Sequence, residues 1–376
     1  MTVAALLSER TESSARFFET SADGLARVCH RMAERFARGG RLIAFGRTPA
    51  ARSDARHVAV EFVHPVIVGK RALPAIALVD QIGLLAAPDD IAMGFGADCD
   101  DAIAMAHERG CLTIAFAPVG AEWEFEPPTS DPYVRQELVE TLYHVLWELV
   151  HVFFEHRGLL EGRTERRVHD AGASSFLYPF LDEREDDLEA VLQDVRRSIL
   201  MKAAEVAALR EQTLTDNADV LVGAADALRR SFAEGGKLLA LGNGGSATDA
   251  MDVVADFHAA GRPAIDLTED PGILTAIAND IGVEAIFSRQ VIAYGAAGDV
   301  VLALSTSGNS GNVIHALAEA RRRGLESIAM VGYDGGRVAG EALADHVVIT
   351  RSEHIPRIQE AQATAYHLLC ALVDAA

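Results

Sequence analysis

Two short segments rich in glycine and hydroxyl side chains have the residue types that bind phosphate. The first reads GNGGS over 242–246 and the second reads STSGNS over 305–310, and each directly follows an apolar run that predicts a β-strand. Glycines at 244 and 245 allow a strand-to-helix turn to bring backbone N–H groups close to an anion, and the N-terminus of the next helix adds partial positive charge. Further hydrogen bonds would come from the hydroxyl groups of Ser246, Ser305, Thr306, Ser307 and Ser310.

Stretches of this composition also occur as ordinary turns, so each segment alone has a second interpretation. The position of both segments, after a predicted strand and before a predicted helix, favours a phosphate site, because ligands of open α/β sheets bind at the carboxyl ends of the strands. A dinucleotide site is disfavoured, because the first turn does not read G-x-G-x-x-G.

An internal repeat organises the chain around these segments. GGRLIAFG at 39–46 matches GGKLLALG at 235–242, and YHVLWELV from Tyr143 matches YHLLCALV from Tyr366. A third match, LPAIALVDQIGLL with RPAIDLTEDPGIL, lies between them in the same order. Three matches in one order indicate a duplicated domain.

Each copy alternates apolar strands with helices, which predicts a parallel sheet covered by helices on both faces. We therefore expect an α/β protein made of two doubly wound, three-layer α/β/α sandwiches, arranged as a pseudo-dimer. The predicted domains are residues 1–159 and 188–376. Residues 160–187 are predicted to be a linker, because this stretch is charged and has no sustained hydrophobic period.

The charge balance argues against several partners. The 376 residues include 34 Lys and Arg against 55 Asp and Glu, a formal net charge of −21. Such a surface repels nucleic-acid backbones and anionic lipids, so we expect neither nucleic-acid nor membrane binding. No apolar run of about 18 residues and no signal-peptide core is found in the sequence. The four cysteines are scattered without a disulfide-rich or metal-binding spacing, so a cytoplasmic protein is expected.

The C-terminal copy resembles a known family. Besides the two loops it carries NDIG at 279–282, FSRQV at 287–291 and RIQE at 357–360. This set, in this order, closely resembles the sugar isomerase (SIS) domain of the phosphoheptose isomerases, over about 187–376. Over the N-terminal half the resemblance is weaker and rests on the internal repeat. The resemblance implies substrate contacts by Asn243, Gly244, Gly245, Ser246, Asp280, Ser305, Thr306, Ser307, Ser310 and Gln359.

The resemblance also implies four catalytic or metal-binding positions. In the family a His and a Glu four residues apart follow the first phosphate loop, and a Gln and a His eight residues apart lie on the C-terminal helix. That Glu and the second His are the family's proposed acid and base, and in several members the four side chains hold zinc. The types and spacing are chemically sensible, since positions i and i+4 share a helix face, and imidazole with carboxylate suits Zn²⁺ or a proton relay.

The C-terminal copy matches this pattern incompletely. Its first pair is Asp252 and Asp256, whereas Gln359 and His367 match the second pair. Asp256 is one methylene shorter than the Glu of the family, so its carboxylate would have to lie about that much further forward to transfer a proton. Zinc binding is disfavoured, because Asp252 stands in place of the His.

The N-terminal copy has the opposite loss. The internal alignment places the full quartet at His57, Glu61, Gln136 and His144, which the resemblance implies as possible Zn²⁺ ligands. In place of the phosphate loops, however, this copy has GRTPAARS and GFGADCDD, and the acidic residues of the second would repel phosphate.

These losses leave three hypotheses. The first is a phosphosugar aldose–ketose isomerase, with sedoheptulose 7-phosphate as the expected substrate, in which the C-terminal loops hold the phosphate while Glu61 and His144 transfer protons through an enediol. The second keeps the same reaction within the C-terminal copy, with Asp256 and His367. The third is a non-catalytic phosphosugar-binding regulator or scaffold. By analogy with the family's tetramers, two chains are expected to form a homodimer with four domains.

Overall fold

The computed structural model describes residues 3–66, 70–79, 81–155, 160 and 187–375. The chain divides into two compact units, which we call the N-terminal unit, Glu9–Glu205, and the C-terminal unit, Val206–Ala376 with Met1–Ser8. The predicted linker lies outside the described residues except at its two ends. The predicted domain boundaries therefore stay a prediction.

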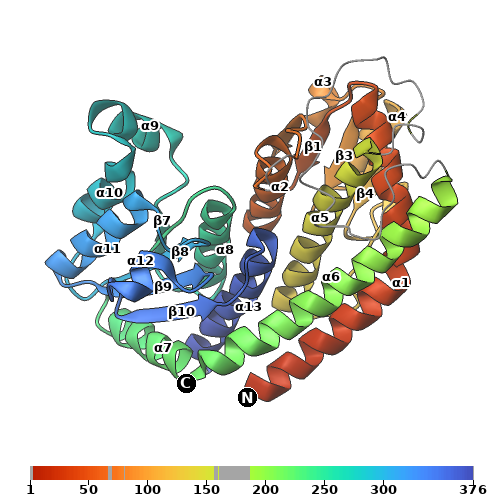
Figure 1. Cartoon of the computed structure of the whole chain (residues 1–376). Coiled ribbons are helices and arrows are strands. Elements are labelled where there is room, and N and C mark those ends of the chain that lie inside the picture. Colours follow the sequence, from red (N-terminus) through yellow and green to blue (C-terminus); the bar gives the residue numbers. More distant parts are fainter. Residues whose placement is uncertain (1–2, 67–69, 80, 156–159, 161–186, 376) are drawn as a thin grey trace. The chain divides into compact units, whose positions relative to one another are not determined.

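The N-terminal unit alternates strands with helices, as the sequence predicts (Figure 1). Its elements are α1 (Val3–Ala37), β1 (Leu42–Phe45), α2 (Pro49–Val63), β2 (Ala75–Leu78), α3 (Ile82–Leu85), β3 (Ile91–Gly94), α4 (Asp100–Glu108), β4 (Leu112–Ala115), β5 (Trp123–Glu124) and α5 (Pro132–Glu155). The next helix, α6 (Leu188–Asp216), contains the division between the units.

The C-terminal unit repeats this alternation, and its last three strands are longer than their counterparts (Figure 1). Its elements are α7 (Ala218–Ala233), β6 (Leu238–Leu241), α8 (Gly245–Ala259), β7 (Ala264–Asp266), α9 (Pro271–Asp280), the 3₁₀ helix η1 (Val283–Ala285), α10 (Ile286–Tyr294), β8 (Val300–Ser305), α11 (Gly311–Arg323), β9 (Glu326–Gly332), α12 (Gly336–Gly340), β10 (His346–Thr350) and α13 (Ile355–Asp374).

The described strands form two five-stranded sheets with the same topology. The order is β2-β1-β3-β4-β5 in one and β7-β6-β8-β9-β10 in the other, and all neighbours are parallel. In each sheet the second strand lies on one side of the first strand and the third strand lies on the other side. The connections therefore change direction between β1 and β3 in one sheet and between β6 and β8 in the other. Ligands of open α/β sheets bind at this switch point. The predicted duplication of a doubly wound fold is confirmed, and the pseudo-dimer arrangement stays a prediction.

Successive side chains along the buried strands point to opposite faces of the sheet. Leu42 and Ala44 of β1 pack in a core with α1, α2 and α5, whereas Ile43 and Phe45 pack in a second core with α3 and α4. Continuous apolar strands of this kind are expected when helices cover both faces of a parallel sheet. Each unit is therefore the predicted three-layer α/β/α sandwich.

The two copies differ in the connection that leads to the switch point. Between β7 and β8 lie α9, η1 and α10, whereas α3 is the helix between β2 and β3. The N-terminal copy thus has a shorter connection between the matching strands. The motifs NDIG and FSRQV fall in the longer connection, at 279–282 and 287–291.

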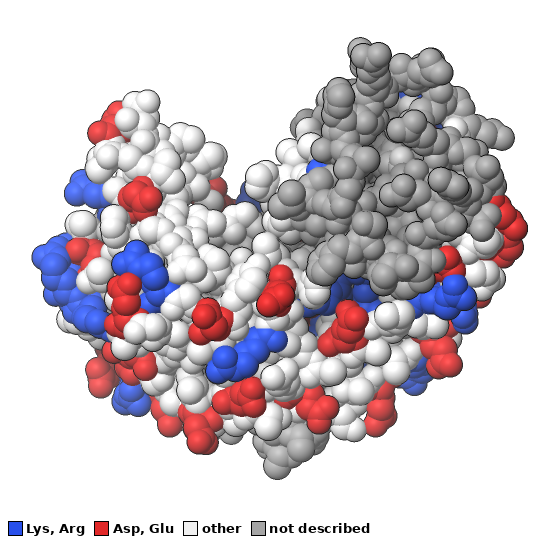
Figure 2. All heavy atoms as spheres, in the orientation of Figure 1, with Lys and Arg blue, Asp and Glu red and all other residues white. Residues whose placement is uncertain are grey.

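Charged side chains of both signs alternate over the described surface of the face drawn in Figure 2. All four cysteines are buried and free, as their scattered spacing suggests. Within the described residues, no helix combines the length and apolar character that crossing a membrane requires.

Candidate functional site

The first predicted phosphate segment forms a tight turn from β6 into α8. Gly244 precedes the first helical residue and has φ +60° and ψ −125°, a conformation that glycine adopts without steric cost. At Gly242, an added Cβ would lie 2.2 Å from the carbonyl oxygen of Ser246, so only glycine allows this close approach. The turn thus presents the N-terminus of α8 at the carboxyl end of β6.

The second segment leaves β8 and begins α11, and hydrogen bonds fix its shape. Ser305 Oγ accepts a hydrogen bond from the backbone N–H of Gly308 at 3.2 Å, and Ser307 Oγ accepts one from the N–H of Asn309 at 3.2 Å. Gly308 has φ +62° and an added Cβ would lie 2.3 Å from the carbonyl oxygen of Gly335. The loop therefore depends on glycine where it packs against the segment that follows β9.

The sheet brings these two segments together. Since β6 and β8 are paired in parallel, their carboxyl ends lie at the same edge, and α8 and α11 both begin there. Ser246 and Ser305 are buried, while Thr306, Ser307 and Ser310 are partly exposed. Two helix N-termini and several hydroxyl groups at one edge make a site that can bind an anion without a cationic side chain.

Two other predicted substrate contacts lie on α9 and α13 of the same unit. Asp280 ends α9 and is exposed, and its Oδ1 accepts a hydrogen bond from Asn279 Nδ2 at 2.7 Å. Gln359 is buried on α13. The roles of both side chains in substrate binding stay predictions.

Sequence reasoning missed Asn312, the second residue of α11. Its side-chain amide is buried and forms a reciprocal pair of hydrogen bonds with that of Asn243, at 3.0 and 2.9 Å. An Asn two residues after Ser310, at the start of a predicted helix, was the available signal. The partner residue could not be known without the sheet order.

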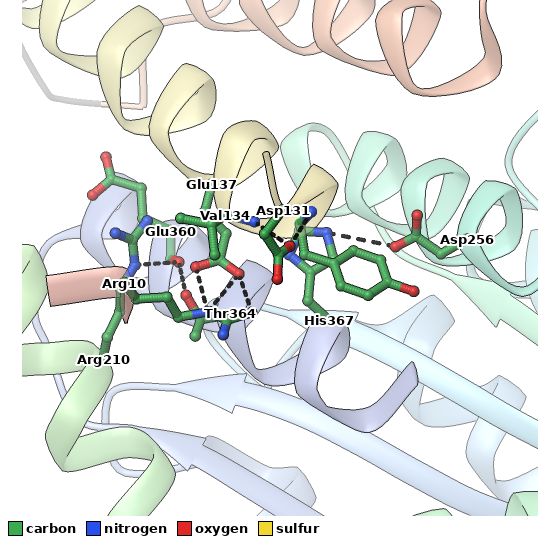
Figure 3. A network of polar contacts seen from close by, with 10 residues as sticks. Arg10, Asp131, Val134, Glu137, Arg210, Asp256, Glu360, Thr364 and His367 are labelled. Carbon is green, nitrogen blue, oxygen red and sulfur yellow. Dashed lines mark hydrogen bonds and ion pairs between the residues drawn. The ribbon is translucent and has the colours of Figure 1, made fainter. Parts of the chain in front are cut away.

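The acid–base candidates of the C-terminal copy form a pair. His367 Nε2 on α13 lies 3.5 Å from Asp256 Oδ2 on α8, as the dashed line in Figure 3 shows. His367 is fully buried, and the Asp256 side chain is 14% exposed. Asp252, one helical turn before Asp256, is also buried. Burial and the charge of Asp256 raise the pKa of the nearby Cys370 thiol well above its usual range, so this cysteine stays protonated.

Three residues of the N-terminal quartet are brought together by α2 and α5. His57 Nε2 lies 3.3 Å from His144 Nε2 and 3.8 Å from Glu61 Oε1, and all three side chains are at most 1% exposed. Their ligand atoms lie within 4.8 Å of one another. Gln136 is buried two helical turns before His144 on the same face of α5.

Ion pairing helps to hold α5 in place. Arg10 on α1 and Glu137 on α5 form a buried ion pair, with Nη2 3.0 Å from Oε1 (Figure 3). Glu137 directly follows Gln136 in the sequence. A buried charge pair of this kind fixes the position of the helix, because breaking it would leave an uncompensated charge.

The electrostatics of α2 favour neutral side chains. Burial, together with the neighbouring His144, lowers the pKa of His57 well below its usual value, so the imidazole is neutral at pH 7. Burial likewise raises the pKa of Asp54, one turn earlier, well above its usual value. Neutral imidazole is the form that binds metal. Two histidines and one carboxylate in mutual contact therefore fit a Zn²⁺ ion by residue type and spacing.

Comparisons with known proteins match the C-terminal half. Residues 203–332 match the family model described as the SIS domain. A phosphoheptose isomerase of Thermodesulfovibrio yellowstonii is 43% identical over 172 residues, which cover 44% of this chain and 85% of the relative. A phosphoheptose isomerase of Citrifermentans bemidjiense is 49% identical over 152 residues, covering 38% of this chain and 77% of that protein.

Solved structures extend the similarity of fold to the whole chain. The C-terminal domain of glucosamine-fructose-6-phosphate aminotransferase from Francisella tularensis is 12% identical, with a TM-score of 0.62, covering 98% of this chain and 93% of that one. A structure titled putative phosphosugar isomerase from Silicibacter pomeroyi is 12% identical with a TM-score of 0.53, covering 97% of this chain and 94% of that one. At this identity the similarity concerns the fold alone.

The depressed pKa of His57 predicts acid destabilisation of the metal-free protein. Between pH 6.5 and 5 the unfolded state takes up a proton at this residue more readily than the folded state, so the free energy of unfolding falls as the pH falls. The expected loss is up to about 2 kcal/mol over that interval. His151, whose pKa burial and nearby Lys70 lower to about 4, adds to the loss in the same direction.

Urea unfolding in the presence of a chelator, at pH 7 and pH 5, measures this loss. Replacing His57 by Gln should reduce it, whereas His258→Gln on the exposed side of α8 should leave it as in the unaltered protein. An equal loss in the His57 variant would contradict the assignment.

Proposed function

Since the chain belongs, through its C-terminal half, to the SIS-domain family of the phosphoheptose isomerases, we propose that it interconverts the ketose and aldose forms of a sugar phosphate. The observation that carries this proposal is the pair of anion-binding loops at the adjacent carboxyl ends of β6 and β8. We further propose sedoheptulose 7-phosphate as the substrate, because it fits the activity named for the relatives.

The phosphate would be bound by neutral groups. Backbone amides at the starts of α8 and α11 and the hydroxyl groups of Ser246, Ser307 and Ser310 can donate hydrogen bonds to its oxygens. This mode of binding suits a chain with a net charge of −21, since it needs no cluster of Lys or Arg.

Isomerisation requires a base and an acid at the carbonyl end of the sugar. A carboxylate removes the proton from the carbon next to the carbonyl, and a histidine protonates the carbonyl oxygen, which gives the enediol; reversal at the other carbon gives the product. We assign these roles to Glu61 and His144, because the N-terminal copy keeps the longer carboxylate and a complete quartet. Asp256 and His367, 3.5 Å apart, are the alternative pair.

In a metal-bound form of the same cluster, His57, Glu61 and His144 would instead act as ligands of a Zn²⁺ ion, with Gln136 as the fourth proposed ligand. When bound, the ion would polarise the carbonyl and stabilise the developing negative charge on its oxygen. The protein's own contribution is to keep His57 neutral and to exclude water around the three buried side chains. We also propose that two chains associate as a homodimer in the cytoplasm.

Two matched carboxamide substitutions identify the base. Glu61→Gln should lower kcat for sedoheptulose 7-phosphate by about 10² to 10⁴, because the base is lost, while the affinity for the sugar phosphate is kept. Asp256→Asn should keep kcat within about tenfold. If Asp256→Asn loses kcat and Glu61→Gln stays active, the proton transfer would be assigned to Asp256 and His367 instead. Phosphosugar binding without turnover in the unaltered protein would favour the regulator or scaffold.

Removal of loop hydroxyl groups should act on substrate binding. Ser307→Ala and Ser310→Ala should each raise KM by about tenfold with little change in kcat, because each loses one hydrogen bond to a charged oxygen. Thr20→Ala removes an exposed hydroxyl from α1 in the other unit and should leave KM unchanged. An unaltered KM in both serine variants would contradict the phosphate assignment.

Metal content distinguishes the two copies. After incubation with Zn²⁺ and removal of the excess, elemental analysis should find about one zinc per chain, lost in His144→Ala because a ligand is missing. His367→Ala changes the equivalent position of the C-terminal copy and should retain the metal. Absence of bound zinc in the unaltered protein, or its retention in His144→Ala, would contradict the proposed ligands.

A further inference from the structure

In the C-terminal copy a side-chain pair bridges the two phosphate loops. Asn243 Nδ2 donates to Asn312 Oδ1 at 3.0 Å, and Asn312 Nδ2 donates back to Asn243 Oδ1 at 2.9 Å. Asn312 Oδ1 also accepts a hydrogen bond from the backbone N–H of Val313 at 2.9 Å. The turn after β6 and the first residues of α11 are thereby tied to each other.

The N-terminal copy has a bridge at the matching place, made of charged side chains. Arg47 Nη2 donates to both carboxylate oxygens of Asp101, at 2.8 Å each, and Arg47 Nη1 donates to the carbonyl oxygen of Asp98. Asp101 Oδ1 also accepts a hydrogen bond from the backbone N–H of Ala102 at 2.8 Å.

The two bridges occupy equivalent positions. Arg47 follows Gly46 after β1, as Asn243 follows Gly242 after β6. Asp101 is the second residue of α4, and Asn312 is the second residue of α11. Both accept a hydrogen bond from the N–H of the next residue. The connection between the loops has therefore been kept in both copies while its chemistry has changed.

The change of chemistry alters what each switch point can bind. A carboxylate at the start of α4 already satisfies the positive end of that helix, and it would repel a phosphate. Asp98 and Asp100 add two further acidic side chains to this loop. The amide pair of the C-terminal copy bridges the same gap without a charge, so the positive end of α11 stays available for an anion.

We infer that the Asn243–Asn312 amide pair is a positioning element of the phosphate site, which holds the two loops at the spacing that phosphate needs while keeping the bridge uncharged. The inference rests on the proposed function. Neither asparagine needs to touch the substrate for this role. The corresponding Arg47–Asp101 pair keeps its loops together but leaves them unsuited to phosphate.

Calorimetric titration with inorganic phosphate tests this role directly. Asn312→Ala should raise the Kd for phosphate about tenfold, because the bridge is lost. Asn312→Asp keeps the acceptor for the Val313 N–H and suits a helix N-terminus, so the midpoint of thermal unfolding should stay unchanged. Its added charge should nevertheless raise the Kd more than tenfold. A purely structural role would spare phosphate binding in this variant.

Further variants show whether the two residues act as a unit. Asn243→Ala alters an exposed residue. If the two asparagines act as a unit, the double variant of Asn243→Ala and Asn312→Ala should have a Kd for phosphate no higher than that of the single variant that binds phosphate more weakly. Asp101→Asn removes the charge at the equivalent position of the N-terminal copy and should leave the Kd for phosphate unchanged.

A Kd within twofold of the unaltered protein in Asn312→Asp and Asn243→Ala would overturn the inference, and so would an equal effect of Asp101→Asn. Failure of the proposed function gives a different result, since the unaltered protein would then bind neither inorganic phosphate nor sedoheptulose 7-phosphate. That result would also overturn the inference.

Discussion

An anion bound without a cationic side chain needs hydrogen-bond donors that are fixed before it arrives, and the C-terminal unit is built around that constraint. The parallel pairing of β6 with β8 puts two helix N-termini at one edge of the sheet. Glycines at 242, 244 and 308 allow the backbone to approach closely, and the hydrogen bonds of Ser305 and Ser307 to their own loop fix its course. The donors therefore lose little freedom when phosphate binds, which favours affinity despite the acidic surface.

The two copies share some parts of the fold and differ in others. Strand order, the position of the switch point and the bridge between its two loops recur in both units. The side chains around this frame have diverged: the C-terminal copy keeps the two uncharged loops proposed to bind phosphate, and the N-terminal copy keeps a buried cluster of His57, Glu61 and His144. Because a doubly wound sheet is stabilised by its apolar layers, its loop residues can diverge without loss of the fold.

Much of the fold was accessible from the sequence, because strand-length apolar runs and the three repeated segments are local features. The two segments proposed to bind phosphate could be found for the same reason, since each is one continuous segment. The proximity of His57 to His144 also followed from the repeat, because an alignment carried α2 and α5 onto a known pattern. The partner of Asn243 could not be predicted, since Asn312 lies 69 residues further along and the pair depends on which strands are neighbours. Asp280 was predicted from its motif alone, and its contact with the substrate stays a prediction.

The central claim is that the chain moves a proton between adjacent carbons of a sugar phosphate. Incubation with sedoheptulose 7-phosphate in D₂O, followed by NMR, tests it most directly, because an enediol exchanges its carbon-bound proton with the solvent. Aldose product that carries deuterium on the carbon that was the carbonyl carbon of the ketose is the expected result. Ketose that stays unconverted and free of deuterium, with and without added Zn²⁺, would contradict it.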